Sequence, residues 1–267
     1  QNRGADFTVC DYVKIDPANT KNVFMCVYDQ GLYSSRNEGN SWYNKHSEMR
    51  KDGTSSWLVA GTDLEIAADG KTMYIAVELS SYGADAGYVI KKSTNGGSTW
   101  KIVLNAKQGQ PLHSWGIYQG LAIDPTDPNI VYVTPNDAKG FTVLKSVDGG
   151  ESWEKKGRDW QGTNNRFRMI KVAPGDPSVL YIIAGKKNNT PGKVYKSFDQ
   201  GESWELLENA PMADPRDIWI DPKDSDHVMV ASSDVDANGG IYASMDGGDS
   251  WEPVLTKTVG ASTEILA

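Results

Sequence analysis

The sequence has little cysteine, little histidine, no long apolar run and no excess of positive charge. Two cysteines are too few for a disulfide framework or a closed thiolate zinc site, and His46, His113 and His227 lie far apart in the chain. No window reaches the roughly 18 consecutive apolar residues of a membrane-spanning helix. The 27 Lys and Arg against 35 Asp and Glu leave a net charge of −8, which argues against nucleic acid or an anionic membrane as the main partner. We therefore expect no metal, no cofactor, no nucleic acid and no membrane.

The two cysteines lie on two expected strands joined by a turn at residues 16–19. Cys10 and Cys26 are almost equidistant from that turn, so an antiparallel hairpin places them on the same face as near neighbours. Two alternatives follow, a cross-strand disulfide or two small buried core residues.

An eight-residue string, Ser-x-Asp/Asn-x-Gly-x-Ser/Thr-Trp, occurs five times, at residues 35–42, 93–100, 146–153, 197–204 and 244–251. The third position is Asn37, Asn95, Asp148, Asp199 and Asp246 in turn. The tryptophans that end the copies are 58, 53, 51 and 47 residues apart. Chance does not produce such spacing, so the chain contains five copies of an internal repeat.

Each copy stands in the same surroundings. An apolar strand ends in a turn, as at residues 12–17, a second strand follows, as at 23–28, and a third leads into the string, which turns the chain into a fourth. β-branched and aromatic residues punctuated by Pro, Gly and Asp favour strands over helices. Four short antiparallel strands per unit of about 50 residues are typical of a β-propeller blade.

The sequence therefore predicts an all-β fold, a β-propeller of four-stranded antiparallel blades, as a single domain or fragment over residues 1–267. Five blades are visible, at approximately 7–46, 62–105, 119–157, 167–208 and 216–256. They form either a five-bladed ring or a piece of a larger propeller.

The string resembles the Asp-box, or BNR repeat, of sialidases, xyloglucan-degrading glycoside hydrolases, sortilin-type receptors and a photosystem assembly factor. In a hairpin its Asp or Asn can accept backbone N–H groups, its Gly supplies a positive φ, and its Trp buries a large apolar face. The resemblance implies a structural turn on the side of the propeller away from the active site, so we exclude the boxes from the candidate site.

Strand direction alternates within a blade, so the Asp-Pro turns and the boxes share one edge, here called the box rim. The other edge, here called the variable rim, holds the connections between second and third strands and between blades, where function is expected. Exposed aromatic rings beside polar groups suit a sugar. The candidate binding residues on this rim are Trp57, His113, Trp115, Tyr118, Trp160, Arg166 and Arg216. The alternative is that each Trp fills a gap between blades.

Glycoside hydrolysis usually needs two carboxylates roughly 5–10 Å apart. Residues 28–33 resemble the segment that carries a catalytic Asp in xyloglucanases, which implies that role for Asp29, although Tyr28 stands in place of Thr and one Gly is missing. In that family the partner carboxylate comes from a second propeller. Asp159 is our second catalytic candidate.

A sialidase comparison is weaker, because residues 167–170 lack the proline of the Arg-Ile-Pro motif. Arg166, Arg168 and Arg216 could cluster on the variable rim and bind an anionic sugar. The alternative is that they are ordinary solvated arginines.

The leading hypothesis is a secreted, extracellular or periplasmic carbohydrate-active propeller that grips a polysaccharide or oligosaccharide and could hydrolyse it, most like the xyloglucanase group. Its further partner would be a second propeller or the remainder of a longer chain. The alternative hypothesis is a non-catalytic Asp-box propeller that binds a protein or acts as a scaffold.

Overall fold

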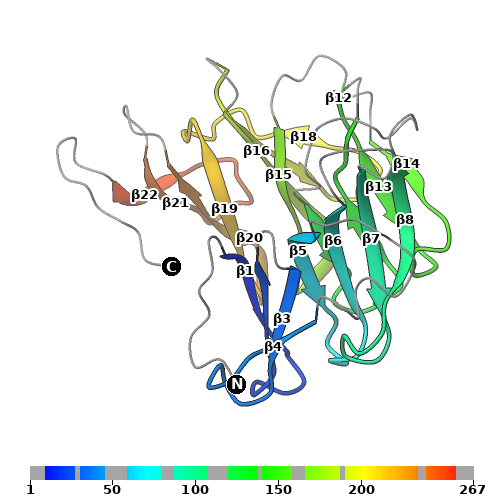
Figure 1. Ribbon diagram of the computed structural model, residues 1–267. Helices are drawn as coiled ribbons and strands as arrows, with labels where there is room; N and C mark the ends of the chain where they lie inside the picture. Colours follow the sequence, from blue (N-terminus) through cyan, green and yellow to red (C-terminus); the bar gives the residue numbers. More distant parts are fainter. Residues whose placement is uncertain are drawn as a thin grey trace. The chain divides into compact units, whose positions relative to one another are not determined.

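The computed structural model describes residues 10–27, 31–45, 59–79, 87–107, 120–137, 140–157, 166–186, 190–233 and 239–256. The chain divides into two compact units, unit 1 over Gln1–Lys155 and unit 2 over Lys156–Ala267. Each unit consists of antiparallel sheets whose strands follow one another in chain order (Figure 1).

Unit 1 holds three four-stranded sheets. Sheet 1 comprises β1 (Cys10–Ile15), β2 (Val23–Val27), β3 (Gly31–Ser35) and β4 (Tyr43–Asn44). Sheet 2 comprises β5 (Val59–Ile66), β6 (Met73–Leu79), β7 (Gly87–Ser93) and β8 (Lys101–Lys107). Sheet 3 comprises β9 (Leu121–Ile123), β10 (Val131–Val133), β13 (Val143–Ser146) and β14 (Glu154–Lys156), with a small hairpin of β11 (Asn136–Asp137) and β12 (Gly140–Phe141) between β10 and β13.

Unit 2 holds two four-stranded sheets. Sheet 4 comprises β15 (Arg166–Ala173), β16 (Asp176–Gly185), β17 (Lys193–Ser197) and β18 (Glu205–Leu206). Sheet 5 comprises β19 (Pro215–Asp221), β20 (Asp224–Ser232), β21 (Gly240–Ser244) and β22 (Glu252–Thr256).

The hydrophobic core lies between neighbouring sheets. Leu32 of sheet 1 packs with Leu64 and Ile75 of sheet 2. In unit 2, Ile183 of sheet 4 belongs to one buried cluster with Ile218 of sheet 5. Face-to-face packing of successive four-stranded meanders is the packing of propeller blades.

The structure confirms the all-β prediction. Every regular element among the described residues is a β-strand, and the five four-stranded antiparallel sheets are blades of a β-propeller joined internally by Asp-box turns. No helix in the described part of the chain is long and apolar enough to cross a membrane.

The five boxes share the hydrogen bonds of their serine and their Asp or Asn, and the second to fifth boxes also share that of their tryptophan, as the third box shows. The Ser146 hydroxyl accepts the amides of Asp148 (3.4 Å) and Gly150 (2.7 Å) and donates to Asp148 Oδ1 (2.8 Å). Asp148 Oδ1 also accepts the Ser152 amide at 2.9 Å, and Trp153 Nε1 donates to the Gly150 carbonyl at 3.2 Å. The box side chains are thus engaged within the turn.

Each box needs two consecutive left-handed residues, one more than the motif suggests. The invariant Gly has φ between 77° and 105°, and the residue before it is also left-handed. That residue is Glu38 in the first box (φ 60°) and Gln200 in the fourth (φ 59°). Positive φ at both central positions is the geometry of a tight hairpin turn.

The expected placement of the two cysteines is wrong. Cys10 pairs with Val27, whereas Cys26 pairs with Tyr12. A β-bulge between Cys10 and Tyr12 shifts the register by one residue, and such a shift moves a side chain to the opposite face. Cys26 is buried, Cys10 is exposed, and they are not joined to each other.

Tyrosine–lysine pairs connect one sheet to the next within each unit. Tyr181 on β16 lies opposite Lys196 on β17, whose Nζ is 5.3 Å from the centroid of the tyrosine ring. The Tyr181 hydroxyl donates to the Ser225 carbonyl of sheet 5 at 2.9 Å, and Lys196 pairs with Asp226 at 2.8 Å. Burial raises the pKa of the Tyr181 hydroxyl well above its ordinary value.

Candidate functional site

The structure describes two of the residues predicted from sequence to form the site. Arg216 is described in full, and Arg166 is described as the first residue of β15 without its side chain. The following predicted residues lie outside the described part of the chain: Asp29, Trp57, His113, Trp115, Tyr118, Asp159 and Trp160. Their roles remain predictions.

β-Bulges mark the first strand of four sheets near its start, at the variable rim. In sheet 4 the register shifts at Arg168, between Phe167 and Met169, and in sheet 5 it shifts at Arg216, between Pro215 and Asp217. Bulges redirect side chains and occur often beside functional sites. The two sheets of unit 2 therefore each present one arginine from an equivalent place.

Both arginines contact one buried carboxylate, Asp214, whose side chain is 9% exposed. Asp214 Oδ1 pairs with Arg168 Nη1 at 2.9 Å and accepts the Lys186 amide at 2.8 Å. Asp214 Oδ2 accepts Arg216 Nη2 at 2.7 Å and the Ser233 hydroxyl at 3.1 Å. The cluster thus joins the starts of β15 and β19 to the ends of β16 and β20.

The environment of Asp214 keeps it ionised. Burial alone would raise the pKa of Asp214, but the Lys186 amide, the Arg168 and Arg216 guanidinium groups and the Ser233 hydroxyl outweigh burial, so the pKa lies below its ordinary value. A carboxylate with both oxygens engaged and a lowered pKa is a poor general acid. Its place in the site is to orient the two arginines.

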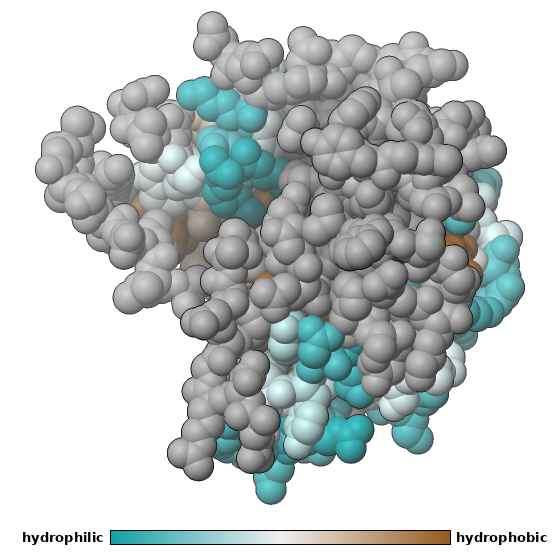
Figure 2. Space-filling view, viewed as in Figure 1, coloured by the Kyte–Doolittle hydropathy of each residue, from teal (hydrophilic) through white to brown (hydrophobic). Residues whose placement is uncertain are grey.

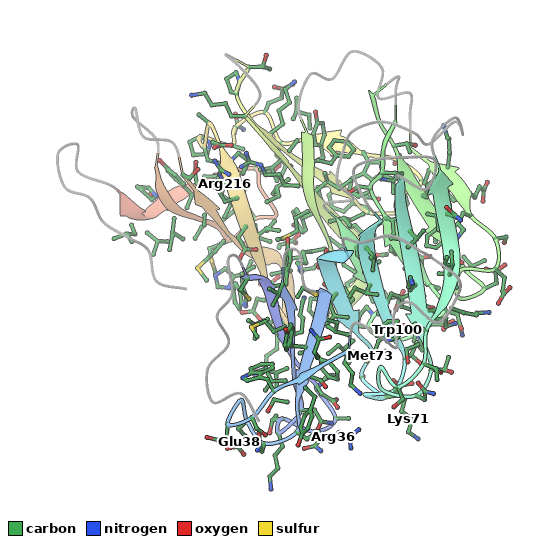
Figure 3. All side chains as sticks on the ribbon, viewed as in Figure 1. Arg36, Glu38, Lys71, Met73, Trp100 and Arg216 are labelled. Carbon is green, nitrogen blue, oxygen red and sulfur yellow. The ribbon has the colours of Figure 1, made fainter. Side chains whose placement is uncertain are left out.

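One edge of the Arg216 guanidinium group is hydrogen-bonded, and its other edge is exposed. Nε donates to the Ser233 hydroxyl at 2.5 Å and Nη2 donates to Asp214 Oδ2 at 2.7 Å. Its side chain is 52% exposed, and nothing else among the described residues hydrogen-bonds the guanidinium group. Figure 3 shows Arg216 on the sheet 5 end of unit 2. The remaining N–H groups can therefore meet a hydroxyl or an anion without the side chain first having to be ordered.

Two other described carboxylates of the variable rim, Asp63 and Asp217, accept backbone amides. Asp63, which is 3% exposed, accepts the Leu64 amide at 2.8 Å and the Leu121 amide at 3.0 Å and so ties sheet 2 to sheet 3. Asp217 accepts the Ile218 amide at 2.8 Å. No described aspartate with a resolved shift has a raised pKa.

Sequence reasoning included Arg168 and Arg216 but did not single out Asp214. The sequence did carry a signal that the two arginines occupy similar places in their repeats, because Arg168 precedes the Ser197 of its box by 29 residues and Arg216 precedes Ser244 by 28. Aligning the repeats on their boxes thus places the two arginines one residue apart. No group of three or more His, Cys, Asp or Glu side chains in the described part of the chain could hold a metal ion.

A hollow of about 470 Å³ lies at the box rim of sheet 1, on the edge that sequence reasoning excluded. Its lining residues are Ser34, Arg36, Asn37, Ser41, Tyr43, Asn44 and Lys45. The box residues Asn37 and Ser41 are engaged in the turn, but the arginine, tyrosine and lysine are not part of the motif. The signal that could have found this hollow is the departure of the first repeat from the others.

Comparisons with known proteins identify similar propellers. A family model described as "Sortilin, neurotensin receptor 3" matches residues 141–264. Xyloglucanase Xgh74A of Acetivibrio thermocellus is 30% identical over 125 residues, 42% of this chain and 14% of that enzyme. The xyloglucanase of Hypocrea jecorina is 25% identical over 215 residues, 72% of this chain and 25% of that enzyme.

Among solved structures, the GH74 xyloglucanase of Xanthomonas campestris superposes with a TM-score of 0.62 at 18% identity, covering 89% of this chain and 36% of that one. This chain thus spans well under half the length of each of these relatives. Structural similarity at 18% sequence identity supports a shared fold alone. The chain is an Asp-box β-propeller, similar in sequence to part of the xyloglucanases.

Proposed function

We propose that this chain is a carbohydrate-active propeller that binds a polysaccharide along its variable rim, with xyloglucan as the first candidate. The observation that carries the proposal is the sequence similarity to a xyloglucanase over 215 residues, 72% of this chain. The variable rim of unit 2 supports it, because Arg216 presents oriented N–H donors that suit sugar hydroxyls. Action on a polymer outside the cell would place the protein in an extracellular or periplasmic location.

Hydrolysis would need a carboxylic acid and a second carboxylate on either side of the scissile bond. Asp214 does not supply the acid, because its pKa is lowered. Asp29 and Asp159 are the proposed catalytic carboxylates, and a second propeller or the remainder of a longer chain would supply a partner if only one of them takes part. Trp57, Trp115, Tyr118 and Trp160 would carry the sugar rings.

The test incubates the protein with xyloglucan and a panel of other plant and microbial polysaccharides, and follows new reducing ends and pull-down together. Activity that disappears in Asp29→Asn or Asp159→Asn but persists in the control Asp249→Asn would support hydrolysis. Binding without cleavage that is lost in Trp115→Ala would support a binding module or half of a split site. No binding to any glycan would refute the proposal.

The second candidate is a non-catalytic propeller that binds a protein. The match of a sortilin receptor family to residues 141–264 favours it. Saturable binding of a protein ligand by a chain that retains no polysaccharide would support this candidate over the first.

A further inference from the structure

We propose that the box rim of unit 2 is a docking surface for a basic, amphipathic segment of another protein. This rim consists of the turns at residues 173–178 and 221–227 and the boxes at 197–204 and 244–251, all of which the structure describes. The described strands of unit 2 that lead into undescribed residues do so at the variable rim, where β16, β20 and β22 end. The surface lies on the opposite edge from the proposed polysaccharide site and does not depend on it.

The second position of the box provides an internal comparison. The three boxes of unit 1 have Arg36, Thr94 and Val147 there. Both boxes of unit 2 have large apolar residues, Phe198 and Met245, which are 54% and 66% exposed. The turn also forms with a polar side chain at this position, so the fold does not require an apolar one. Apolar side chains left in water gain free energy when a partner covers them.

Phe198 lies at the seam between sheets 4 and 5. The Lys196 ammonium group is 4.4 Å from the centroid of the Phe198 ring, and the lysine side chain is only 3% exposed. The same ammonium group pairs with Asp226 of sheet 5 at 2.8 Å and lies against Gly247 of the fifth box, where a Cβ would clash with it. Phe198 thus packs on a lysine that reaches the box of Met245, so the two apolar side chains belong to adjacent parts of one surface.

The surface around these two side chains is acidic. The turns and boxes of unit 2 contain eight carboxylates, one lysine and no arginine. The corresponding turns and boxes of sheets 1 and 2, at residues 16–22, 35–42, 67–72 and 93–100, contain three carboxylates and three cations. Figure 3 labels Arg36, Glu38 and Lys71 at those tips, and Figure 2 shows hydrophilic surface at this end. Exposed apolar residues and an excess of negative charge therefore occur together in unit 2 and are both missing from the boxes of sheets 1 and 2.

Negative charge reaches the seam itself. The Tyr181 hydroxyl donates to the Ser225 carbonyl at 2.9 Å, and Asp224 and Asp226 lie on either side of Ser225 in the chain. Burial, and then the charges of Asp226 and Asp224, raise the pKa of the Tyr181 hydroxyl well above its ordinary value. In the fifth box, hydrogen bonds from the Ser250 hydroxyl and amide lower the pKa of Asp246 to about 2. The rim therefore stays negatively charged at neutral pH.

The chemistry of this surface selects the partner. Two exposed apolar side chains inside an acidic rim fit a polypeptide segment whose apolar side chains are flanked by lysine or arginine. The opposite charges steer such a segment and fix its position, and the apolar contacts supply affinity. The open face of the Phe198 ring also suits the guanidinium group of an arginine. The same charges repel nucleic acid and anionic membranes.

The test is fluorescence anisotropy of three labelled synthetic peptides titrated with the whole chain. In the first peptide leucines are separated by pairs of lysines. The second has serine in place of each leucine, and the third has glutamate in place of each lysine. The variants Phe198→Ser and Met245→Ser remove the apolar side chains, and Asp224→Asn removes one charge at the seam.

Each variant has a matched control. Val254→Ser removes an apolar side chain that is 60% exposed on β22 of the same unit, outside the box. Glu38→Gln removes an exposed carboxylate from the box of sheet 1. Circular dichroism and thermal melts check that each variant keeps the fold. If Phe198→Ser unfolds, Met245→Ser and Asp224→Asn carry the test.

We expect the lysine–leucine peptide to bind, with an affinity that falls about tenfold in Phe198→Ser, less in Met245→Ser, and about twofold in Asp224→Asn at low salt. Val254→Ser and Glu38→Gln should bind like the wild type, and added salt should weaken binding because it screens exposed charges. The inference is overturned if this peptide does not bind, if the serine or glutamate peptide binds equally well, or if the variants bind like their controls. Polysaccharide binding is measured separately on the same variants and should not change, so either proposal can fail without the other.

Discussion

Replacement of Asp214 should destabilise unit 2 through the two arginines that it orients. Asp214→Ala removes a side chain that is 9% exposed and accepts hydrogen bonds from the Lys186 amide and the Ser233 hydroxyl. It also leaves Arg168, whose side chain is 21% exposed, without its carboxylate.

The magnitude follows from the burial of each partner. Breaking a buried ion pair by removing one partner costs about 3–5 kcal/mol. Arg168 is only partly buried, and Arg216 is half exposed, so the pair with Arg216 adds only about 0–1 kcal/mol. We expect Asp214→Ala to lower the free energy of unfolding by about 3 kcal/mol. Asp214→Asn, which keeps one acceptor for the Lys186 amide, should cost about 2 kcal/mol.

The assay is urea unfolding followed by tryptophan fluorescence and by circular dichroism. The control is Asp217→Ala, which removes an exposed carboxylate that accepts one amide and should cost about 0.5–1 kcal/mol. The reasoning is refuted if Asp214→Ala is no more destabilising than Asp217→Ala.

The pH dependence gives an independent check. The pKa of Asp214 is lowered in the folded protein, so its stabilising contribution is complete above the ordinary pKa of about 4 and declines as the pH falls below it. The difference between the wild type and Asp214→Ala should therefore be larger at pH 7 than at about pH 3. A difference that grows on acidification would contradict the assigned charge.

Three further predictions concern the repeat. The pKa of Asp246 is lowered to about 2, first by hydrogen bonds from the Ser250 hydroxyl and amide. In urea titrations Asp246→Asn should therefore be less stable than the wild type at pH 5, and the difference should shrink as the pH falls toward 2. An equal difference at both pH values would contradict this. Tyr181→Phe removes the hydrogen bond to the next sheet and should cost about 1 kcal/mol in urea unfolding, and no loss would show that the bond is replaced by water. Gly150→Ala should lower the melting temperature more than Gly39→Ala. Both glycines have positive φ, but a Cβ at Gly150 would lie 2.7 Å from a valine Cβ of the preceding sheet, whereas at Gly39 the nearest atom, of the Trp42 ring, is 3.5 Å away. Equal shifts in melting temperature would refute the steric argument.

The strands and boxes were predictable because their signals are local. The serine and the third residue of a box bond within eight residues of each other, as Ser244 and Asp246 do, so the spacing alone indicates the turn. The second left-handed residue, Glu38 or Gln200, was missed because neither side chain favours positive φ. The turn closes on the invariant Gly and imposes that conformation on its neighbour.

The cysteine prediction failed where a bulge breaks the two-residue period of a strand. Counting residues from a turn assumes an uninterrupted ladder, and the bulge between Cys10 and Tyr12 moves Cys10 to the other face. The same kind of irregularity directs Arg168 and Arg216 toward Asp214, and no local pattern marks it.

The sequence by itself determined the all-β class, the five four-stranded repeats and the position of every box, because these depend on hydrogen bonds and apolar alternation between near neighbours in the chain. Only the tertiary structure decided that Asp214 gathers Arg168 and Lys186 beside its near neighbour Arg216, since the first two contacts join residues 46 and 28 positions apart. It also decided that Arg36, Tyr43 and Lys45 line one hollow. Such sites arise where separate strands or the two sides of a turn meet, and the meeting depends on register, bulges and packing between sheets rather than on local spacing.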